Sequence, residues 1–170
     1  MLLHRSPGTG KSFFIKRIKE CTRVKVKITA TSGIAAMSIN GSTIDWLLEM
    51  RYESEKKKGN YRNYYSRVED INKRLGDASL IIIDEVSMMG CSKFKELDAM
   101  LKKAKNCDLP FGGLDILLCG DFAQLPAVKQ TSLHDALVQS TQTYIAPDDN
   151  VMAAATPLAK FIKFELITFK

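Results

Sequence analysis

The chain has 170 residues, a length that predicts one domain with a substantial hydrophobic core. Its hydrophobic fraction of 45% and charged fraction of 26% are those of an ordinary globular protein, and no apolar run approaches the roughly 20 residues that a membrane-spanning helix needs. The net charge of +6 favours polyanionic partners, although a solvated basic surface explains it equally well. Composition therefore excludes an integral membrane protein and leaves the function open.

The cysteine pattern indicates neither a metal site nor a disulfide framework. No two of the four cysteines form a C-x-x-C pair, and none is spaced from a histidine as zinc ligands are; the residues concerned are Cys21, Cys91, Cys107, Cys119, His4 and His134. We interpret the cysteines as reduced thiols and expect an intracellular protein, in the nucleus or mitochondrion if the organism is a eukaryote.

The first motif is Pro7-Gly8-Thr9-Gly10-Lys11-Ser12, which precedes an apolar and basic segment. Glycines let the backbone approach a phosphate closely, and the first turn of a following helix offers unpaired N–H groups to it. Lys11 would reach the β- and γ-phosphates of ATP, and the Ser12 hydroxyl would bind Mg²⁺. The alternative is a glycine-rich turn that only caps a helix. Arg5 stands where the full pattern has a glycine.

Apolar periodicity predicts strands alternating with helices along the rest of the chain. We expect helices over residues 11–20, 34–37, 43–50, 67–75 and 92–105, strands over 24–30, 80–83, 114–119 and 161–169, a turn at 110–113, and turns and loops over 125–156. Basic alternate residues in 24–30 indicate an edge strand or a face turned towards phosphates. Only residues 2–4 are available for a strand before the first motif, so we expect a truncated chain.

Residues 53–66 form the least globular stretch and combine lysines with tyrosines. We interpret them as an exposed insertion. Its tyrosines could stack on single-stranded bases, but a hydrophilic loop explains the same composition. The overall order of elements predicts a three-layer α/β domain with a mostly parallel sheet.

The second motif is the apolar strand Leu80–Ile83 followed by Asp84 and Glu85. The carboxyl edge of a parallel sheet is where α/β folds bind their ligands. Asp84 would hold Mg²⁺, and Glu85 would orient or deprotonate the attacking water. The alternative is a strand that ends in a negatively charged helix cap.

The third motif is the strand that leads into Gly120-Asp121-Phe122-Ala123-Gln124-Leu125-Pro126. The neutral amide of Gln124 can reach a γ-phosphate and report its presence. Gly120 would let the loop pass close to the nucleotide. A glycine followed by an aspartate after a strand is also a common turn, so this motif is weak when taken alone.

The runs GTGKS, ATSGIAA, LIIIDEVSMM and GDFAQLPAV, in this order, resemble the first motor domain of the Pif-type DNA helicases, in the RecD-like branch of superfamily one. The resemblance extends from Pro7 to about Leu166. It implies a RecA-like P-loop domain, over residues 1–170, of an enzyme that uses ATP and Mg²⁺ to track 5′-to-3′ on single-stranded DNA. It also implies roles in DNA repair, recombination and telomere maintenance.

The resemblance assigns roles to residues of this chain. It implies nucleotide contacts from Pro7, Gly8, Thr9, Gly10, Lys11, Ser12, Asp84 and Gln124, with Ser12 and Asp84 on Mg²⁺. Glu85, Lys11 and Gln124 would be catalytic, and Gln124 would couple the γ-phosphate to the DNA track. Thr31, Ser32, Gly33 and Ile34 would lie along the DNA backbone; taken alone, this segment predicts only a turn and a helix start.

Three positions depart from the family pattern, and one whole domain is missing. Arg5 replaces a loop glycine, Ala127 replaces a proline, and Asp45 replaces a histidine and would repel DNA phosphates. The second motor domain, with its arginine finger, is not in this chain. We therefore expect the isolated chain to bind ATP, hydrolyse it feebly and not unwind DNA. The alternatives are a different P-loop NTPase and a non-catalytic fragment that binds nucleic acid through its basic face.

Overall fold

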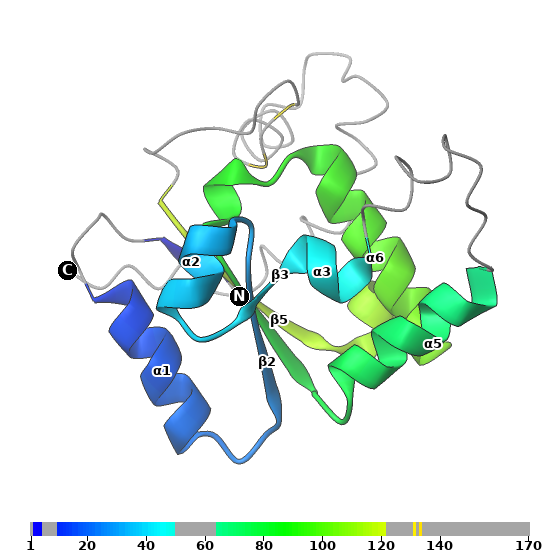
Figure 1. Ribbon diagram of the computed structural model, residues 1–170, viewed down its shortest axis with the longest axis horizontal. Helices are drawn as coiled ribbons and strands as arrows, with labels where there is room; N and C mark the ends of the chain where they lie inside the picture. The colour runs from blue at the N-terminus through cyan, green and yellow to red at the C-terminus, as the bar shows by residue number, and fades with distance from the viewer. Residues whose placement is uncertain (1, 5–9, 50–63, 122–130, 132, 134–170) are drawn as a thin grey trace.

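A computed structural model describes residues 2–4, 10–49, 64–121, 131 and 133 (Figure 1). Its centre is one sheet of five strands in the order β1-β5-β4-β2-β3, and every neighbouring pair is parallel. The strands are β1 (Leu2–His4), β2 (Val26–Ala30), β3 (Ser42–Thr43), β4 (Leu80–Asp84) and β5 (Asp115–Gly120). Because all strands run the same way, their carboxyl ends meet at one edge of the sheet, and the loops that carry the sequence motifs begin there.

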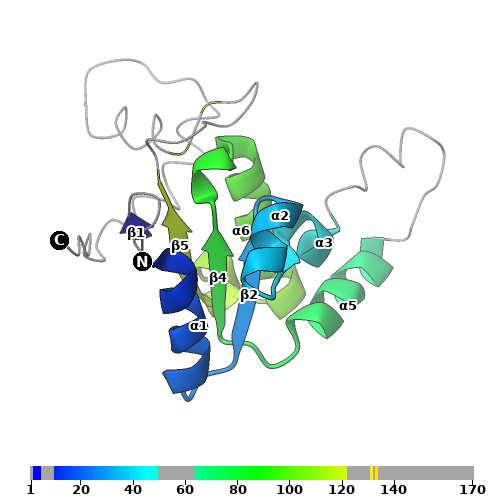
Figure 2. The same ribbon diagram turned by 60° about the vertical axis from the view of Figure 1, so that its left-hand side comes forward.

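Helices cover both faces of the sheet, which makes three layers (Figure 2). Apolar residues alternate between the two faces of the central strands: Ile81, Ile83, Ile116 and Leu118 belong to one buried cluster, whereas Ile82, Leu117 and Cys119 belong to the other. Helices α1 (Lys11–Cys21) and α2 (Gly33–Ser38) pack on the second cluster. Helices α3 (Ile44–Leu48), α5 (Tyr64–Leu75) and α6 (Cys91–Lys105) pack on the first. The predicted three-layer α/β fold with a mostly parallel sheet is confirmed.

Most of the predicted elements in the described residues are confirmed, with small shifts in their bounds. The predicted turn at residues 110–113 is the 3₁₀ helix η2 (Pro110–Gly113), and a second 3₁₀ helix, η1 (Val86–Met88), follows β4. Side-chain hydroxyls begin the two short helices, because Ser32 accepts the Ala35 N–H and Thr43 accepts the Trp46 N–H. Residues 161–169, and all of 125–156 except residues 131 and 133, lie outside the described residues.

Two predictions about the exposed parts of the chain need correction. The strand expected over residues 24–30 begins only at Val26, and β2 is not an edge strand, because β3 pairs with its last two residues. The helix expected over residues 67–75 begins three residues earlier, because α5 starts at Tyr64, inside the stretch that was expected to be an insertion. The charge pattern around β2 carries no information about β3, which pairs with it from a later part of the chain.

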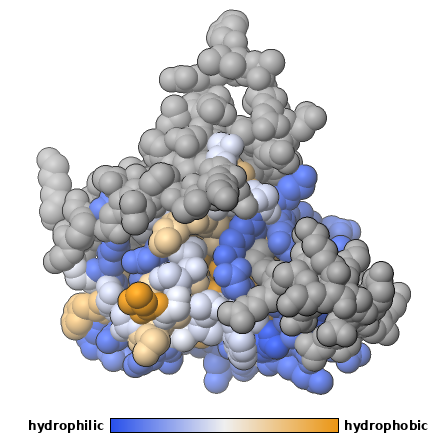
Figure 3. All heavy atoms as spheres, turned by 45° about the horizontal axis from the view of Figure 1, so that its top comes forward, coloured by the Kyte–Doolittle hydropathy of each residue, from blue (hydrophilic) through white to orange (hydrophobic). Residues whose placement is uncertain are grey.

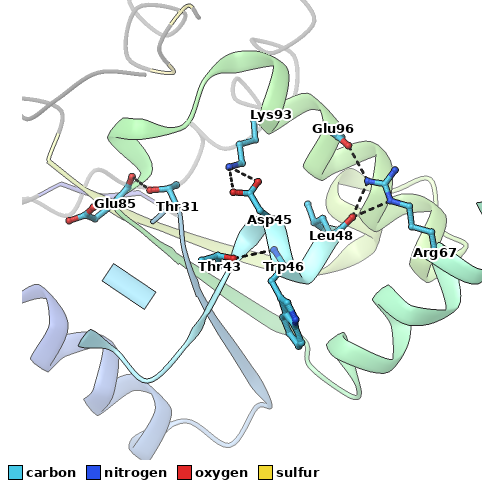
Figure 4. Close-up of polar contacts among 9 residues, drawn as sticks. All are labelled: Thr31, Thr43, Asp45, Trp46, Leu48, Arg67, Glu85, Lys93 and Glu96. Atoms are coloured by element: carbon cyan, nitrogen blue, oxygen red, sulfur yellow. Dashed lines mark hydrogen bonds and ion pairs between the residues drawn. The ribbon is translucent and has the colours of Figure 1, made fainter. Parts of the chain in front are cut away.

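Two arginines of α5 hold α3 in place beside the sheet. Arg67 is buried and donates from Nε and Nη2 to the Leu48 carbonyl at 3.2 and 3.0 Å, and Nη2 also contacts Glu96 of α6 at 3.1 Å (Figure 4). Arg74 pairs with Glu49 at 2.6 Å and lies over the Trp46 ring, 4.5 Å from its centroid. These contacts hold the carboxyl-terminal end of α3, a five-residue helix that also carries Asp45.

None of the helices in the described part of the chain is long and apolar enough to span a membrane.

Candidate nucleotide and DNA site

The candidate nucleotide site begins where α1 starts. Gly10 has a φ of +83°, a left-handed conformation that favours glycine, and its carbonyl accepts the first helical bond from the Phe14 N–H at 2.9 Å. Lys11 is the first residue of α1 and is half-buried, whereas Ser12 is exposed. The helix therefore begins at the residue that the loop motif predicts. Arg5, Pro7, Gly8 and Thr9 lie outside the described residues.

Asp84 ends β4 as a buried carboxylate, with 5% of its surface exposed. Burial raises the pKa of Asp84 above its ordinary value, while the hydrogen bond from the Glu85 N–H and the positive charge of Lys11 act in the opposite direction. Lys11 is the first residue of α1, and Asp84 is the last residue of β4. A lysine and a buried carboxylate therefore stand on the same carboxyl edge of the sheet.

The residues at this point fit an Mg²⁺ ion held together with phosphates. Mg²⁺ is usually bound by one or two carboxylates and by phosphate oxygens, without a dedicated protein cage. Asp84 offers such a carboxylate, and burial leaves its charge in need of a cation. In the described part of the chain no group of three or more His, Cys, Asp or Glu side chains could hold a metal by itself. Asp84 and the exposed Ser12 hydroxyl are therefore the candidate ligands.

Glu85 is held in an unusual backbone conformation next to Asp84. Its φ of +54° and ψ of +41° are left-handed, which costs a non-glycine residue about 1–2 kcal/mol. The Glu85 N–H donates to Asp84 Oδ1 at 2.9 Å, and the Glu85 carbonyl accepts from the Thr31 hydroxyl at 2.7 Å (Figure 4). Ser32 Oγ lies 3.4 Å from Glu85 Oε2. Strained conformations fixed by several bonds are typical of functional sites.

The third motif follows the end of β5, where Cys119 and Gly120 lie next to the candidate site. Burial raises the pKa of the Cys119 thiol to about 12, and the negative charge of Asp84 adds to the effect, so the thiol is protonated at neutral pH. A Cβ on Gly120 would lie 2.9 Å from Val86 Cγ1 and 3.1 Å from the Val86 nitrogen. Gly120 is thus required for the close approach of β5 and η1, a contact that the sequence did not reveal. Asp121 is buried, and Gln124 and Ala127 lie outside the described residues.

The segment predicted to contact DNA, Thr31–Ile34, lies directly beside the two carboxylates. The Thr31 N–H donates to the Asp84 carbonyl at 3.1 Å, and the Thr31 hydroxyl donates to Glu85. The hydroxyls of Thr31 and Ser32 already have hydrogen-bond partners inside the protein. The groups of this segment that remain available to DNA are therefore its backbone and the residues that follow Ser32. The link between the segment and Glu85 was not predicted, since 54 residues separate Thr31 from Glu85.

Apolar side chains of α2 and α1 are strongly exposed near this segment. Ile34 and Met37 of α2 have 85% and 80% of their surfaces accessible, and Phe13 of α1 has 69%. Figure 3, which turns the carboxyl edge towards the viewer, shows a small apolar cluster among weakly polar residues, with hydrophilic side chains beyond it. Such a surface can contact the apolar faces of bases.

Asp45, which was expected to repel DNA phosphates, is paired. Lys93 Nζ, in the first turn of α6, lies 2.7 Å from Asp45 Oδ1 and 2.8 Å from Oδ2 (Figure 4). The pair offsets the negative charge of Asp45, which the family resemblance led us to expect beside a DNA track. No local pattern reveals it, because the two residues are 48 positions apart.

Comparison with known proteins identifies the family. The model of the family described as PIF1-like helicase matches residues 1–146. The chain is 35% identical over 137 residues to the ATP-dependent DNA helicase PIF1 of Xenopus laevis, a match that covers 75% of this chain and 20% of the relative.

Solved structures agree in fold. The Pif1 helicase of Candida albicans superposes with a TM-score of 0.63 at 26% identity, over 79% of this chain and 32% of that one. The Bacteroides Pif1 helicase in complex with ADP-AlF3 and single-stranded DNA has a TM-score of 0.59 at 27% identity, over 83% of this chain and 32% of that one. The chain spans about a fifth of the length of the Xenopus relative. It belongs to the PIF1-like helicase family.

Proposed function

We propose that this chain is the first motor domain of an ATP-dependent DNA helicase, which binds and hydrolyses ATP with Mg²⁺ and tracks 5′-to-3′ on single-stranded DNA. The observation that carries the proposal is the placement of Lys11, at the start of α1, and of the buried carboxylate Asp84, at the end of β4, on the same carboxyl edge of the sheet. The Bacteroides relative in complex with ADP-AlF3 and single-stranded DNA supports both classes of ligand.

The chemistry proposed is phosphoryl transfer to water, in which positioning and charge stabilisation do most of the work. Lys11 would neutralise charge on the β- and γ-phosphates. Asp84 and Ser12 would hold Mg²⁺, which supplies further charge neutralisation when it is bound. Glu85 would orient the attacking water and accept its proton. Gln124, outside the described residues, is proposed to respond to the γ-phosphate.

A complete motor would need a second domain. Because the chain spans about a fifth of a curated relative, we propose that its partner in catalysis is a second motor domain, which supplies an arginine finger. The isolated chain would then bind ATP, hydrolyse it slowly and not unwind DNA. Roles in DNA repair, recombination and telomere maintenance, and a nuclear or mitochondrial location in a eukaryote, are part of the same proposal, and no membrane partner is proposed.

The first test is thermal unfolding with and without Mg²⁺-ATP. A ligand at a hundred times its Kd stabilises the folded state by about 2.7 kcal/mol, which corresponds to a melting-temperature rise of roughly 5–10 °C in a domain of this size. We expect such a rise for the wild type and none for Lys11→Ala. Lys16→Ala, an exposed lysine of the same helix, is the matched control and should keep the full rise.

The same assay tests the metal ligand. With Asp84→Ala, ATP should stabilise the protein equally with and without Mg²⁺, because the proposed carboxylate ligand is gone. An unchanged Mg²⁺ dependence in this variant would remove Asp84 from the metal site. A folded wild type that shows no rise with Mg²⁺-ATP would contradict the nucleotide-binding proposal as a whole.

A further inference from the structure

Thr31 connects the segment proposed to contact DNA with the residue proposed to activate water. Its N–H donates to the Asp84 carbonyl at 3.1 Å and its hydroxyl donates to the Glu85 carbonyl at 2.7 Å. Figure 4 shows the Thr31 side chain directed at the Glu85 backbone. Thr31 is therefore bonded to the backbone of both residues whose side chains are the proposed hydrolytic carboxylates.

Glu85 needs such support, because its left-handed backbone conformation is unfavourable for a residue with a side chain. The Thr31 hydroxyl holds the Glu85 carbonyl, and Asp84 Oδ1 holds the Glu85 N–H. The direction in which the Glu85 carboxylate points thus depends on where the end of β2 and the start of α2 lie.

The other side of the same segment is open to solvent. Gly33 is exposed, and Ile34 has 85% of its surface accessible. Ser32, between Thr31 and these residues, both caps α2 through the Ala35 N–H and lies within 3.4 Å of the Glu85 carboxylate. A DNA strand bound along Gly33 and Ile34 would press on the segment that is hydrogen-bonded to Glu85 through both Thr31 and Ser32.

We infer that Thr31 is a positioning residue, whose hydroxyl couples occupancy of the DNA-binding segment to the orientation of Glu85 and hence to ATP hydrolysis. The inference rests on the proposed function. It reassigns the Thr31 side chain from a DNA contact to an internal link.

The chain offers a matched control for this test. Thr29 is two residues earlier on β2, and its hydroxyl donates to the Ile82 carbonyl at 2.8 Å, again from β2 to the chain of β4. Thr29→Val therefore removes the same kind of bond between the same two segments, away from the carboxylates. Any effect that comes only from a weakened sheet should appear in Thr29→Val as well.

The experiment is single-turnover ATP hydrolysis, with the full chain in excess over ATP so that slow rates can be measured. Each rate is measured with and without oligothymidylate. We expect the oligonucleotide to accelerate the wild type. Thr31→Val should lower the accelerated rate about tenfold, within the range of coupling residues, while the Kd values for Mg²⁺-ATP and the oligonucleotide change less than about twofold. Thr31→Ser should restore the acceleration, and Thr29→Val should keep it.

Thr31→Ala, which removes the same hydroxyl with less bulk, is the second variant if Thr31→Val does not fold. Undiminished acceleration in either variant overturns the inference, as does an equal loss in Thr29→Val. A wild type that binds both ligands but hydrolyses ATP at one rate with and without DNA also overturns it. A wild type that binds neither ligand contradicts the proposed function instead, so the two failures are distinguishable.

Discussion

At the scale of single residues, the site combines groups that are unfavourable for the stability of the empty protein. Asp84 is a carboxylate whose burial penalises its charged form. Glu85 occupies a left-handed conformation that glycine would adopt more easily. Both costs are understandable if the site is built for a cation, phosphates and a positioned water, since strain and desolvation gather at functional sites.

Asp84→Asn should stabilise the protein in the absence of nucleotide. Burial raises the folded-state pKa of Asp84, so the folded protein binds this proton more tightly than the unfolded chain does, and the stability contributed by Asp84 falls as the pH rises through that pKa. An amide has no charge to desolvate and still accepts the Glu85 N–H. We expect a melting temperature about 2–4 °C higher at pH 7, equivalent to about 1 kcal/mol.

The pH dependence provides the control for Asp84. The advantage of Asp84→Asn should shrink as the pH is lowered through the folded-state pKa of Asp84, where the wild-type carboxyl becomes neutral too. If Asp84→Asn were more stable than the wild type by the same amount at every pH, desolvation of the Asp84 charge would not be the cause of the added stability. The same variant should lose the Mg²⁺-dependent part of the stabilisation by ATP, so that gained stability and lost ligand binding appear together.

At the scale of elements, β5 and η1 approach each other so closely that the position between them requires glycine. Gly120→Ala would place a methyl group 2.9 Å from Val86 Cγ1 and 3.1 Å from the Val86 nitrogen. Overpacking of this kind costs about 1–3 kcal/mol. Gly33→Ala is the matched control, because a Cβ there meets nothing within 4 Å.

Chemical denaturation of both glycine variants measures the difference. Gly120→Ala should lose about 1–3 kcal/mol, whereas Gly33→Ala should stay within about 0.5 kcal/mol of the wild type. Equal stabilities of the two variants would show that η1 moves aside at no cost. Because η1 follows Glu85 directly, Gly120→Ala should also weaken the proposed hydrolysis.

The helices and strands also show how much of the fold could be predicted from the sequence alone. The apolar run Leu80–Ile83 and the periodicity of α6 predicted their elements within a residue, because local periodicity reports which side of an element is buried. The same reasoning left β2 as either an edge strand or a strand with one face towards phosphates, because no pattern near β2 in the sequence predicts β3, which pairs with Thr29 and Ala30.

The candidate site likewise has features that the sequence predicted and features that it did not. The motifs located Lys11 and Asp84 at one sheet edge, since the carboxyl ends of parallel strands must meet. They did not reveal the bond from Thr31 to Glu85 or the pair of Asp45 and Lys93, because each joins residues about fifty positions apart and depends on how helices and strands pack. The left-handed conformation of Glu85 was also beyond prediction, since glutamate does not favour it.

At the scale of the whole molecule, a formal net charge of +6 should attract DNA, but where the charge lies decides what it does. The sequence alone does not reveal which basic side chain lies beside the proposed DNA track. Lys93 reaches Asp45 from α6, and the charges of the two side chains offset each other. If DNA binds at this edge as proposed, Asp45 lowers DNA affinity by occupying Lys93, rather than by repelling phosphates as an unpaired group.

Asp45→Asn should release Lys93 for contact with a DNA phosphate. Each phosphate neutralised on a single strand makes the slope of log affinity against log salt steeper by about 0.7. We expect this change in slope, with about threefold tighter binding of oligothymidylate at low salt, measured by fluorescence anisotropy across a salt series. Adding Lys93→Ala to Asp45→Asn should return the slope to the wild-type value.

The matched control for Asp45 is Glu20→Gln, which makes the same change in net charge near the carboxyl-terminal end of α1, where Glu20 pairs with Arg17 at 2.9 Å. If net charge alone governs affinity, the two single variants will bind DNA equally tightly and the role given to Lys93 is wrong. If the track passes Lys93, only Asp45→Asn will steepen the salt dependence. The charge that matters for DNA would then be the charge at the carboxyl edge of the sheet, beside the nucleotide site.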